Sequence, residues 1–208
     1  TLGYWHNHAD DRTRSLIRDL SGQPVYSGAI SAYGRTWSLP ASGLAPSATR
    51  ETHALYGVEL NGRFDNGWRW TAVGSKYDFV RSQTHTASLA PPVGPVGGPG
   101  TVADLGGSGW ETADLRSSGP LGEHHTLYAG LHGDRYVLDS RVRQAGDWRG
   151  DANGPQQSAF GGRTRTYAAY VQDVWGFAPA WTLTVGGRWE QWRAYDGLRA
   201  NASSSLRY

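Results

Sequence analysis

Histidines stand close to carboxylates at three places in this chain, and these residue types could bind a metal ion or move a proton. His6 and His8 lie two residues apart in an expected strand, ahead of Asp10 and Asp11. Alternate residues of a strand share a face, so the two imidazoles could approach one metal ion. The pattern fixes no third ligand, and a polar strand end accounts for the same residues. We therefore expect no metal site.

His132 and Asp134 form the second candidate, a general base with the carboxylate that would orient it. Both residues come from one expected strand, and the sequence identifies no nucleophile to join them. Glu123, His124 and His125 form the third candidate and follow a short turn, where a polar rim is the expected role. The chain has no cysteine, which excludes thiolate ligands and cysteine nucleophiles. We predict no catalytic residue, no cofactor and no enzymatic activity.

Aromatic and guanidinium side chains gather in two polar segments of the chain. Tyr33, Arg35 and Trp37 lie in the first segment, and Trp148 and Arg149 lie in the other. Guanidinium groups pair with carboxylate or hydroxamate oxygens, and aromatic faces exclude water around such pairs. We expect these five residues to contribute to a site for an anionic ligand. Packing between neighbouring loops is the alternative role.

Alternation of side chains identifies the elements that position these residues. From Trp181 to Glu190, every second residue is apolar or glycine, and the residues between them are small, polar or charged. A tryptophan stands at each end of the apolar face, Trp181 and Trp189. A period of two over about 9–11 residues, with aromatic residues at both ends, is typical of a strand that crosses a bilayer beside a wet lumen. Residues 166–176 and 181–193 are therefore expected to form a transmembrane hairpin.

Two further strands show the same alternation. Residues 52–64 alternate except at Leu55, residues 65–67 (DNG) give a turn signal, and the strand that begins at Trp68 departs from alternation only at Val73. The expected lipid-facing or aromatic-girdle residues are Tyr56, Val58, Leu60, Trp68, Trp70, Trp175, Trp181, Leu183, Val185 and Trp189. The expected lumen-facing residues are Glu59, Arg69, His132, Asp134, Arg188 and Glu190. Lys76 and Asp78 fall on the apolar face at the level where a lipid-facing band about 25 Å tall should end.

Connection lengths alternate between short and long along the chain. Seven strands are expected, near residues 1–8, 52–64, 68–77, 110–116, 124–138, 166–176 and 181–193. Short turns are expected at 65–67, 118–122 and 176–180, and long loops at 9–50, 82–108 and 139–163, with a fourth loop starting in 194–208. Up-and-down membrane barrels have short turns on the periplasmic side and long loops outside. The predicted fold is therefore all-β, an antiparallel up-and-down transmembrane β-barrel segment.

Composition agrees with a β-strand membrane protein. The chain has 208 residues, with 10 Trp and 11 Tyr against 4 Phe, an aromatic balance typical of membrane interfaces. Mean hydropathy is low, −0.56, because only alternate residues of a barrel strand meet lipid. The net charge is only +2 and Lys76 is the one lysine, so no basic stripe indicates a nucleic-acid partner. No methionine is present, so we expect an incomplete piece of a longer protein whose export signal lies upstream.

The hairpin TYAAYVQDVWGFAPAWTLTVGGRWEQWR (residues 166–193) resembles a barrel hairpin of TonB-dependent outer-membrane receptors. The segments LYGVELNGRFDNGWRWTAVGSKYDF, HGDRYVLDS and TLGYWHNH resemble further barrel strands of that family. The resemblance implies that residues 1–208 are part of a 22-stranded barrel in the outer membrane of a Gram-negative bacterium. Nothing in the chain resembles the plug domain, which in this family fills the barrel and engages TonB.

The resemblance also implies a function, active import of a scarce ligand. The expected ligand is an iron–siderophore chelate, and the expected partners are outer-membrane lipid and the TonB system, which would act through the absent plug. Two alternatives remain open at the level of sequence: a passive porin-like channel, and a soluble β-rich carbohydrate-binding domain.

Overall fold

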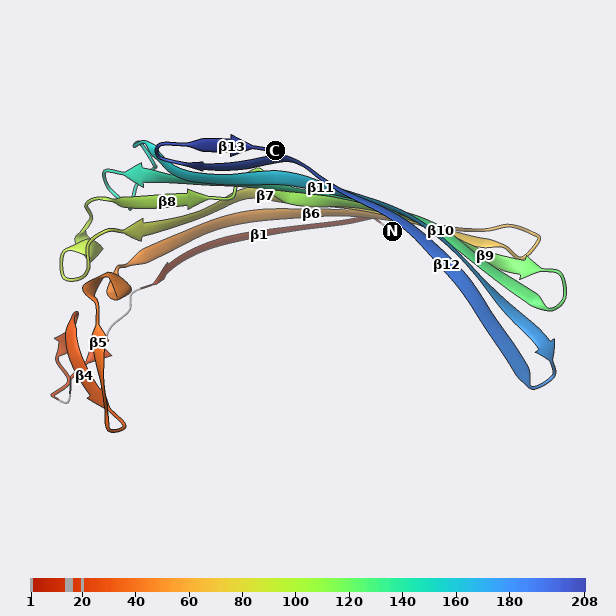
Figure 1. Cartoon of the computed structure of the whole chain (residues 1–208), viewed down its shortest axis with the longest axis horizontal. Helices are drawn as coiled ribbons and strands as arrows, with labels where there is room; N and C mark the ends of the chain where they lie inside the picture. Colours follow the sequence, from red (N-terminus) through yellow and green to blue (C-terminus); the bar gives the residue numbers. More distant parts are fainter. Residues whose placement is uncertain (1, 14–16, 20) are drawn as a thin grey trace.

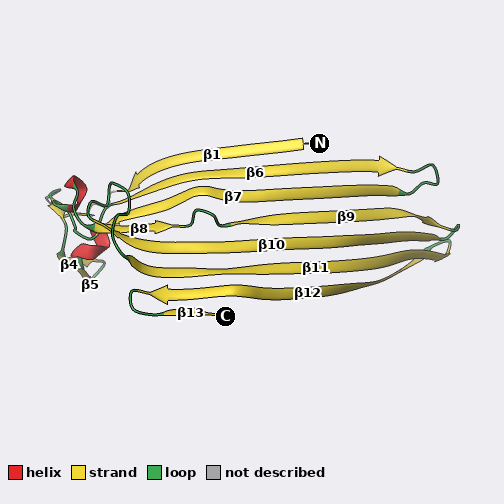
Figure 2. Cartoon of the chain, turned by 90° about the horizontal axis from the view of Figure 1, so that it is seen from above, coloured by secondary structure: helices red, strands yellow, loops and turns green. Residues whose placement is uncertain are grey.

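The computed structural model describes residues 2–13, 17–19 and 21–208. These residues form a nine-stranded antiparallel sheet and two small two-stranded sheets. The long strands are β1 (Leu2–Thr13), β6 (Ser47–Arg63), β7 (Arg69–Ala87), β9 (Gly109–Leu121), β10 (His125–Ala145), β11 (Gln156–Ala178) and β12 (Trp181–Asn201). Figure 2 shows these seven strands side by side in chain order.

The short elements all lie in the connections at one end of the sheet or at its edge. They are β2 (Ile17–Arg18), β3 (Pro24–Val25), β4 (Gly28–Ala32), β5 (Arg35–Leu39), β8 (Gly100–Asp104), β13 (Ser205–Arg207) and the 3₁₀ turns η1 (Ala41–Leu44) and η2 (Gly94–Val96). β8 and β9 both lie between β7 and β10, so together they fill one strand position of the sheet. β4 pairs with β5 and β2 pairs with β3 as separate hairpins.

The three short turns join β6 to β7, β9 to β10 and β11 to β12, and they lie together at the end of the sheet opposite the long loops (Figure 2). In the first of these turns Gly67 has a positive φ of 86°, and the side chain of Asn66 accepts a hydrogen bond from the Trp68 amide at 3.2 Å. The predicted up-and-down order of strands, with alternating short and long connections, is confirmed.

Several segments expected to be loops are strands. β7 continues to Ala87 and β8 lies inside the expected second loop; β10 continues to Ala145 and β11 begins at Gln156, both inside the expected third loop. The expected loop 9–50 contains the end of β1, the β2–β3 and β4–β5 hairpins and the start of β6, and β12 extends to Asn201. The turns predicted at 118–122 and 176–180 are shorter, because β9 reaches Leu121 and β11 reaches Ala178. Beyond a membrane both faces of a strand meet water, so these extensions are held by backbone ladders and carry no apolar alternation.

The sheet is curved, with a concave and a convex side (Figure 1). It has no single hydrophobic core: among the described residues the buried apolar side chains are mostly alanines, and the large apolar side chains are mainly exposed. Such an exposed apolar surface is stable only against another apolar phase. A small buried hydrophobic cluster lies at the loop end, where Trp148 packs with Ala48 and Ala87.

Candidate functional site

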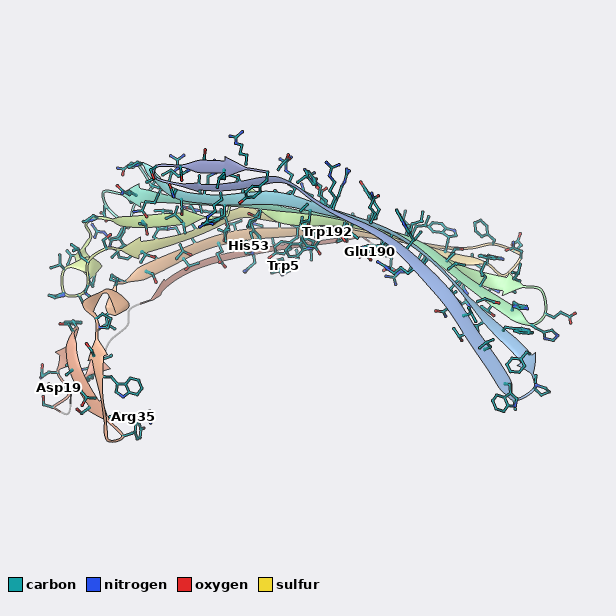
Figure 3. The ribbon with its side chains drawn as sticks, in the orientation of Figure 1. Trp5, Asp19, Arg35, His53, Glu190 and Trp192 are labelled. Atoms are coloured by element: carbon teal, nitrogen blue, oxygen red, sulfur yellow. The ribbon has the colours of Figure 1, made fainter. Side chains whose placement is uncertain are left out.

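Register divides the side chains between the two sides of the sheet, since directly paired residues point to the same face. One cross-strand row on the concave face contains Glu59, Val73, Asp114, His132, Ala168 and Glu190. Figure 3 shows Trp5, His53, Glu190 and Trp192 on the concave side. Arg69, Asp134 and Arg188 have the same facing by register, so the six residues expected toward a lumen share the concave face.

His132 lies between two carboxylates in this row. Its Nδ1 is 3.1 Å from Asp114 Oδ1 and its Nε2 is 3.1 Å from Asp134 Oδ2, and Arg116 approaches Asp114 at 3.7 Å. Both ring nitrogens are therefore occupied, which fixes the imidazole rather than leaving it free to take a proton from a substrate. The cluster is a structural polar network on the concave face.

Other polar pairs continue this network along the same face. Arg188 donates two hydrogen bonds to Glu190 Oε2, at 3.0 and 2.8 Å. The Asn61 side-chain amide donates to Glu59 Oε1 at 2.9 Å, and Thr71 donates to Asn61 Oδ1 at 2.8 Å. A wet lumen accommodates such a surface, because both charge signs are paired and solvated there.

An aromatic layer lies above the polar network, toward the long loops, and was missed by the sequence reasoning. The indole of Trp110 stacks on Tyr77 with ring centres 4.2 Å apart. On one side Trp5 lies 6.4 Å from Tyr77, and on the other side Tyr136 lies 6.3 Å from Trp110. His53 donates to or accepts from the Tyr77 hydroxyl at 2.7 Å. The sequence signal of this aromatic layer was the break in alternation at Leu55, which pairs with Trp5 and Tyr77 on the concave face.

A cavity of about 670 Å³ adjoins this layer. It is lined mainly by aromatic and apolar side chains over a row of glycines, and its wall includes Phe79, Trp110, Tyr136 and Leu138. Gly161 and Gly162 have no side chain and are not covered by a neighbouring ring, so a flat group can approach the sheet closely there. The concave face therefore combines a polar lower part with an apolar upper part.

The convex face carries the residues expected toward lipid. Its central row contains Leu60, Ala72, Leu115, Leu131, Ala169 and Trp189. Tyr56, Val58, Leu183 and Val185 have the same facing, and Val185 is 61% exposed. This continuous apolar surface has the chemistry of a lipid contact.

Aromatic side chains collect on the convex face near the short turns. Trp175 stacks on His125 with ring centres 5.6 Å apart, and Phe177 lies 5.4 Å from Trp175 and 6.5 Å from Trp181. The indole rings of Trp70 and Trp68 cover Gly62 and Gly119, where any Cβ would collide with them. Glycine at these two positions allows each tryptophan to lie flat on the sheet, as expected of an interfacial aromatic girdle.

The five residues expected in a ligand site separate into two groups. Tyr33, Arg35 and Trp37 lie on or next to the β4–β5 hairpin, which hangs on the concave side at the loop end of the sheet (Figure 1). Tyr33 forms the tip of the hairpin with a positive φ of 52°, and Trp37 is 57% exposed. These three side chains are available to a ligand.

Trp148 is not available in this way, because its side chain is only 5% exposed. Its indole N–H donates to the Gly94 carbonyl at 2.9 Å, and its own carbonyl lies 2.8 Å from His85 Nδ1. Trp148 therefore has the alternative role, packing between neighbouring loops. Arg149 is half exposed and bonds Asp147, whose pKa it lowers to about 2 mainly through that side-chain hydrogen bond.

Neither a metal centre nor a membrane helix is found in the described part of the chain. No group of three or more His, Asp or Glu side chains described there is placed to hold a metal ion. The side chains of His8, Asp10 and Asp11 lie outside the described ones, so the expectation about His6 and His8 is not tested. Among residues 2–13, 17–19 and 21–208, no helix is long and apolar enough to cross a bilayer.

A long-stranded antiparallel sheet with an apolar convex face, a polar concave face and all short turns at one end defines the wall of an outer-membrane β-barrel. Residues 2–207 match the family described as TonB dependent receptor-like, beta-barrel, and the chain belongs to it. Comparisons with curated proteins and with solved structures gave no match. The family sits in the outer membrane and consists of non-enzymatic, TonB-dependent transporters, so the predictions of family, fold class, location and absence of enzymatic activity are confirmed. Membership also removes the passive-channel and soluble-domain alternatives.

Proposed function

We propose that this chain forms part of a receptor that imports iron held in an anionic organic chelate. TonB-dependent transport follows from the family, and the ligand class is the new element of the proposal. The supporting observation is the β4–β5 hairpin, which carries Arg35 beside the exposed aromatic rings of Tyr33 and Trp37. A guanidinium group forms charge-assisted hydrogen bonds with carboxylate or hydroxamate oxygens, and adjacent aromatic faces lower the local dielectric around them.

The concave face supports the same proposal. On the concave face, the aromatic layer of Tyr77, Trp110 and Tyr136 borders the 670 Å³ cavity. This cavity has room for the organic part of a chelate. Below it the surface turns polar at His132 and Asp134, as suits a hydrated path. We propose that Glu59, Arg69, His132, Asp134, Arg188 and Glu190 face that path.

The direct test is uptake by cells that produce the full-length receptor and lack other iron-chelate receptors. Labelled ferric trihydroxamate and ferric tricatecholate serve as probes, with cyanocobalamin as the comparison. We expect saturable uptake of one ferric chelate that disappears when TonB is deleted. TonB-dependent uptake of cyanocobalamin without uptake of either ferric chelate would assign another ligand class.

Replacing Arg35 and Trp37 together by alanine should weaken chelate binding to cells by more than tenfold, about 1.4 kcal/mol, because it removes both the charge and the aromatic cover. Arg18→Ala is the matched control, since Arg18 lies in the same connection and bonds only the Gly22 carbonyl in the described residues. The measurement is a binding isotherm on whole cells, normalised to the amount of receptor in the outer membrane. Equal binding by the double variant and the control would exclude the hairpin from the ligand site.

A further inference from the structure

Three arginines from three neighbouring strands lie in one row on the convex face. The row contains Lys76, Glu111, Arg135, Arg165 and Arg193, each paired in register with the next. Like charges directly opposite each other in a sheet are destabilising. The three neighbouring arginines of this row, Arg135, Arg165 and Arg193, therefore require a source of negative charge.

Side chains of the described residues supply that charge only at one end of the row. Lys76 lies 3.2 Å from Asp78 and 4.0 Å from Glu111, and Glu111 lies 3.9 Å from Arg135. Within the described part of the chain, Arg165 and Arg193 have no acidic side chain within 4.0 Å, whereas Arg163 in the adjacent row is paired with Asp196 at 2.9 Å. The unmatched positive charge is thus centred on β11 and β12.

Two tyrosines hold the central arginine in place. The guanidinium carbon of Arg165 lies 5.7 Å from the ring centre of Tyr167 and 5.7 Å from that of Tyr195. Contact with two aromatic faces orients the guanidinium plane and leaves its N–H edge available to an acceptor. Arg165 is therefore arranged in advance for an anion, with Arg193 and Arg135 on either side.

The level of the row on the barrel identifies where that anion comes from. Along β11, Arg165 lies ten residues from Trp175, the residue of the aromatic girdle near the short turns. Ten residues of a strand tilted by about 40° rise roughly 25 Å, the height of the apolar band of a barrel. The arginine row therefore lies at the upper edge of the band, on the side of the long loops, where the headgroups of the outer leaflet meet the protein.

We propose that Arg135, Arg165 and Arg193 bind a phosphate group of a phosphorylated lipid in the outer leaflet of the outer membrane. Guanidinium groups bind phosphate oxygens in a bidentate manner, and juxtamembrane basic residues attract anionic headgroups. The aliphatic stems of the arginines lie along the apolar band while their charged ends reach the headgroup level. The phosphate neutralises the row, so the lipid becomes a fixed contact between β10, β11 and β12. This site is on the outer side of the barrel and does not depend on which ligand is transported.

Binding of lipid A to the purified full-length receptor tests the proposal. Native mass spectrometry would compare bisphosphorylated lipid A with its dephosphorylated form, for the natural protein and for Arg165→Gln/Arg193→Gln. We expect the double variant to bind bisphosphorylated lipid A at least tenfold more weakly, and the natural protein to show the same loss with the dephosphorylated lipid. Arg116→Gln/Arg188→Gln, which removes the same charge from the concave face, should bind as the natural protein does.

Equal lipid binding by the natural protein and the convex double variant would overturn the proposal. Displacement of the lipid by millimolar inorganic phosphate would overturn it too, because it would indicate a site for free anions. The single variant Arg193→Gln guards against a failure to fold, because the Arg193 side chain makes no hydrogen bond or ion pair with the described residues, and its backbone stays paired with Arg165. We expect at least a threefold loss of lipid affinity for this variant, and unchanged affinity would also contradict the site.

Discussion

Val171→Arg should destabilise the barrel by about 2–4 kcal/mol, because it places a charge on the convex face near the middle of the bilayer. Val171 lies four residues from Trp175 and six from Arg165 on β11, so it is close to the centre of the apolar band. Its neighbour Gln172 points to the concave face, where it pairs with Tyr128 and Gly186. Gln172→Arg should cost less than about 1 kcal/mol, since water reaches that face.

The measurement is denaturant unfolding of the full-length receptor from lipid vesicles, with the two variants compared at one lipid composition. Val185→Arg and Thr184→Arg form a second pair with the same opposite facing, nearer the short turns. The difference within this pair should be smaller, because the cost of a charge falls toward the interface. Equal costs for Val171→Arg and Gln172→Arg would contradict the assignment of the convex face to lipid.

Trp148→Ala should free the connection between β10 and β11 from the sheet without unfolding the barrel. The substitution removes a side chain that is 5% exposed, its packing on Ala48 and Ala87, and its hydrogen bond to Gly94. Loss of a buried tryptophan costs about 3–5 kcal/mol, and here this cost lowers the free energy of local opening of the connection, not that of unfolding the barrel. Cleavage of this connection by a protease of broad specificity should become at least a hundredfold faster, because cleavage follows the population of the open form.

Arg149→Ala is the matched control for this experiment. Its side chain is half exposed and bonds only Asp147 among the described residues, so cleavage should remain close to that of the natural protein. The amount of heat-modifiable barrel reports that the sheet is intact in both variants. If Trp148→Ala leaves the connection as resistant as Arg149→Ala does, the packing of Trp148 against Ala48, Ala87 and Gly94 does not hold this connection on the sheet.

The membrane-crossing part of the fold was predictable because lipid imposes a pattern on the sequence. Trp181, Leu183, Val185 and Trp189 alternate with polar or small residues, and this alternation predicted a strand with these four side chains on one face, as the register of β12 has them. Where the strands leave the membrane, no such requirement exists. The polar end of β7 and the whole of β8 therefore read as loop, although their backbones pair in register.

The candidate site was only partly predictable, since its contacts join residues far apart in the sequence. Trp148 bonds Gly94 across 54 residues, so nothing in its local sequence indicated that it would be buried. The aromatic layer at Tyr77 and Trp110 and the row formed by Arg165 and Arg193 both depend on strand register. A shift of register by one residue would move each of these side chains to the other face, and alternation within one strand does not specify its partner.

A cysteine scan of β12 tests the central claim most directly, that this sheet is a barrel wall with lipid on its convex side. The chain has no cysteine, so single substitutions at positions 182–189, in a receptor cleared of cysteines elsewhere, report one site at a time. The thiols would be labelled with a fluorophore in the outer membrane and quenched from either lipid or water. We expect positions 183, 185, 187 and 189 to be quenched from lipid and positions 182, 184, 186 and 188 from water. The same quenching at neighbouring positions, or an inverted alternation, would contradict the account.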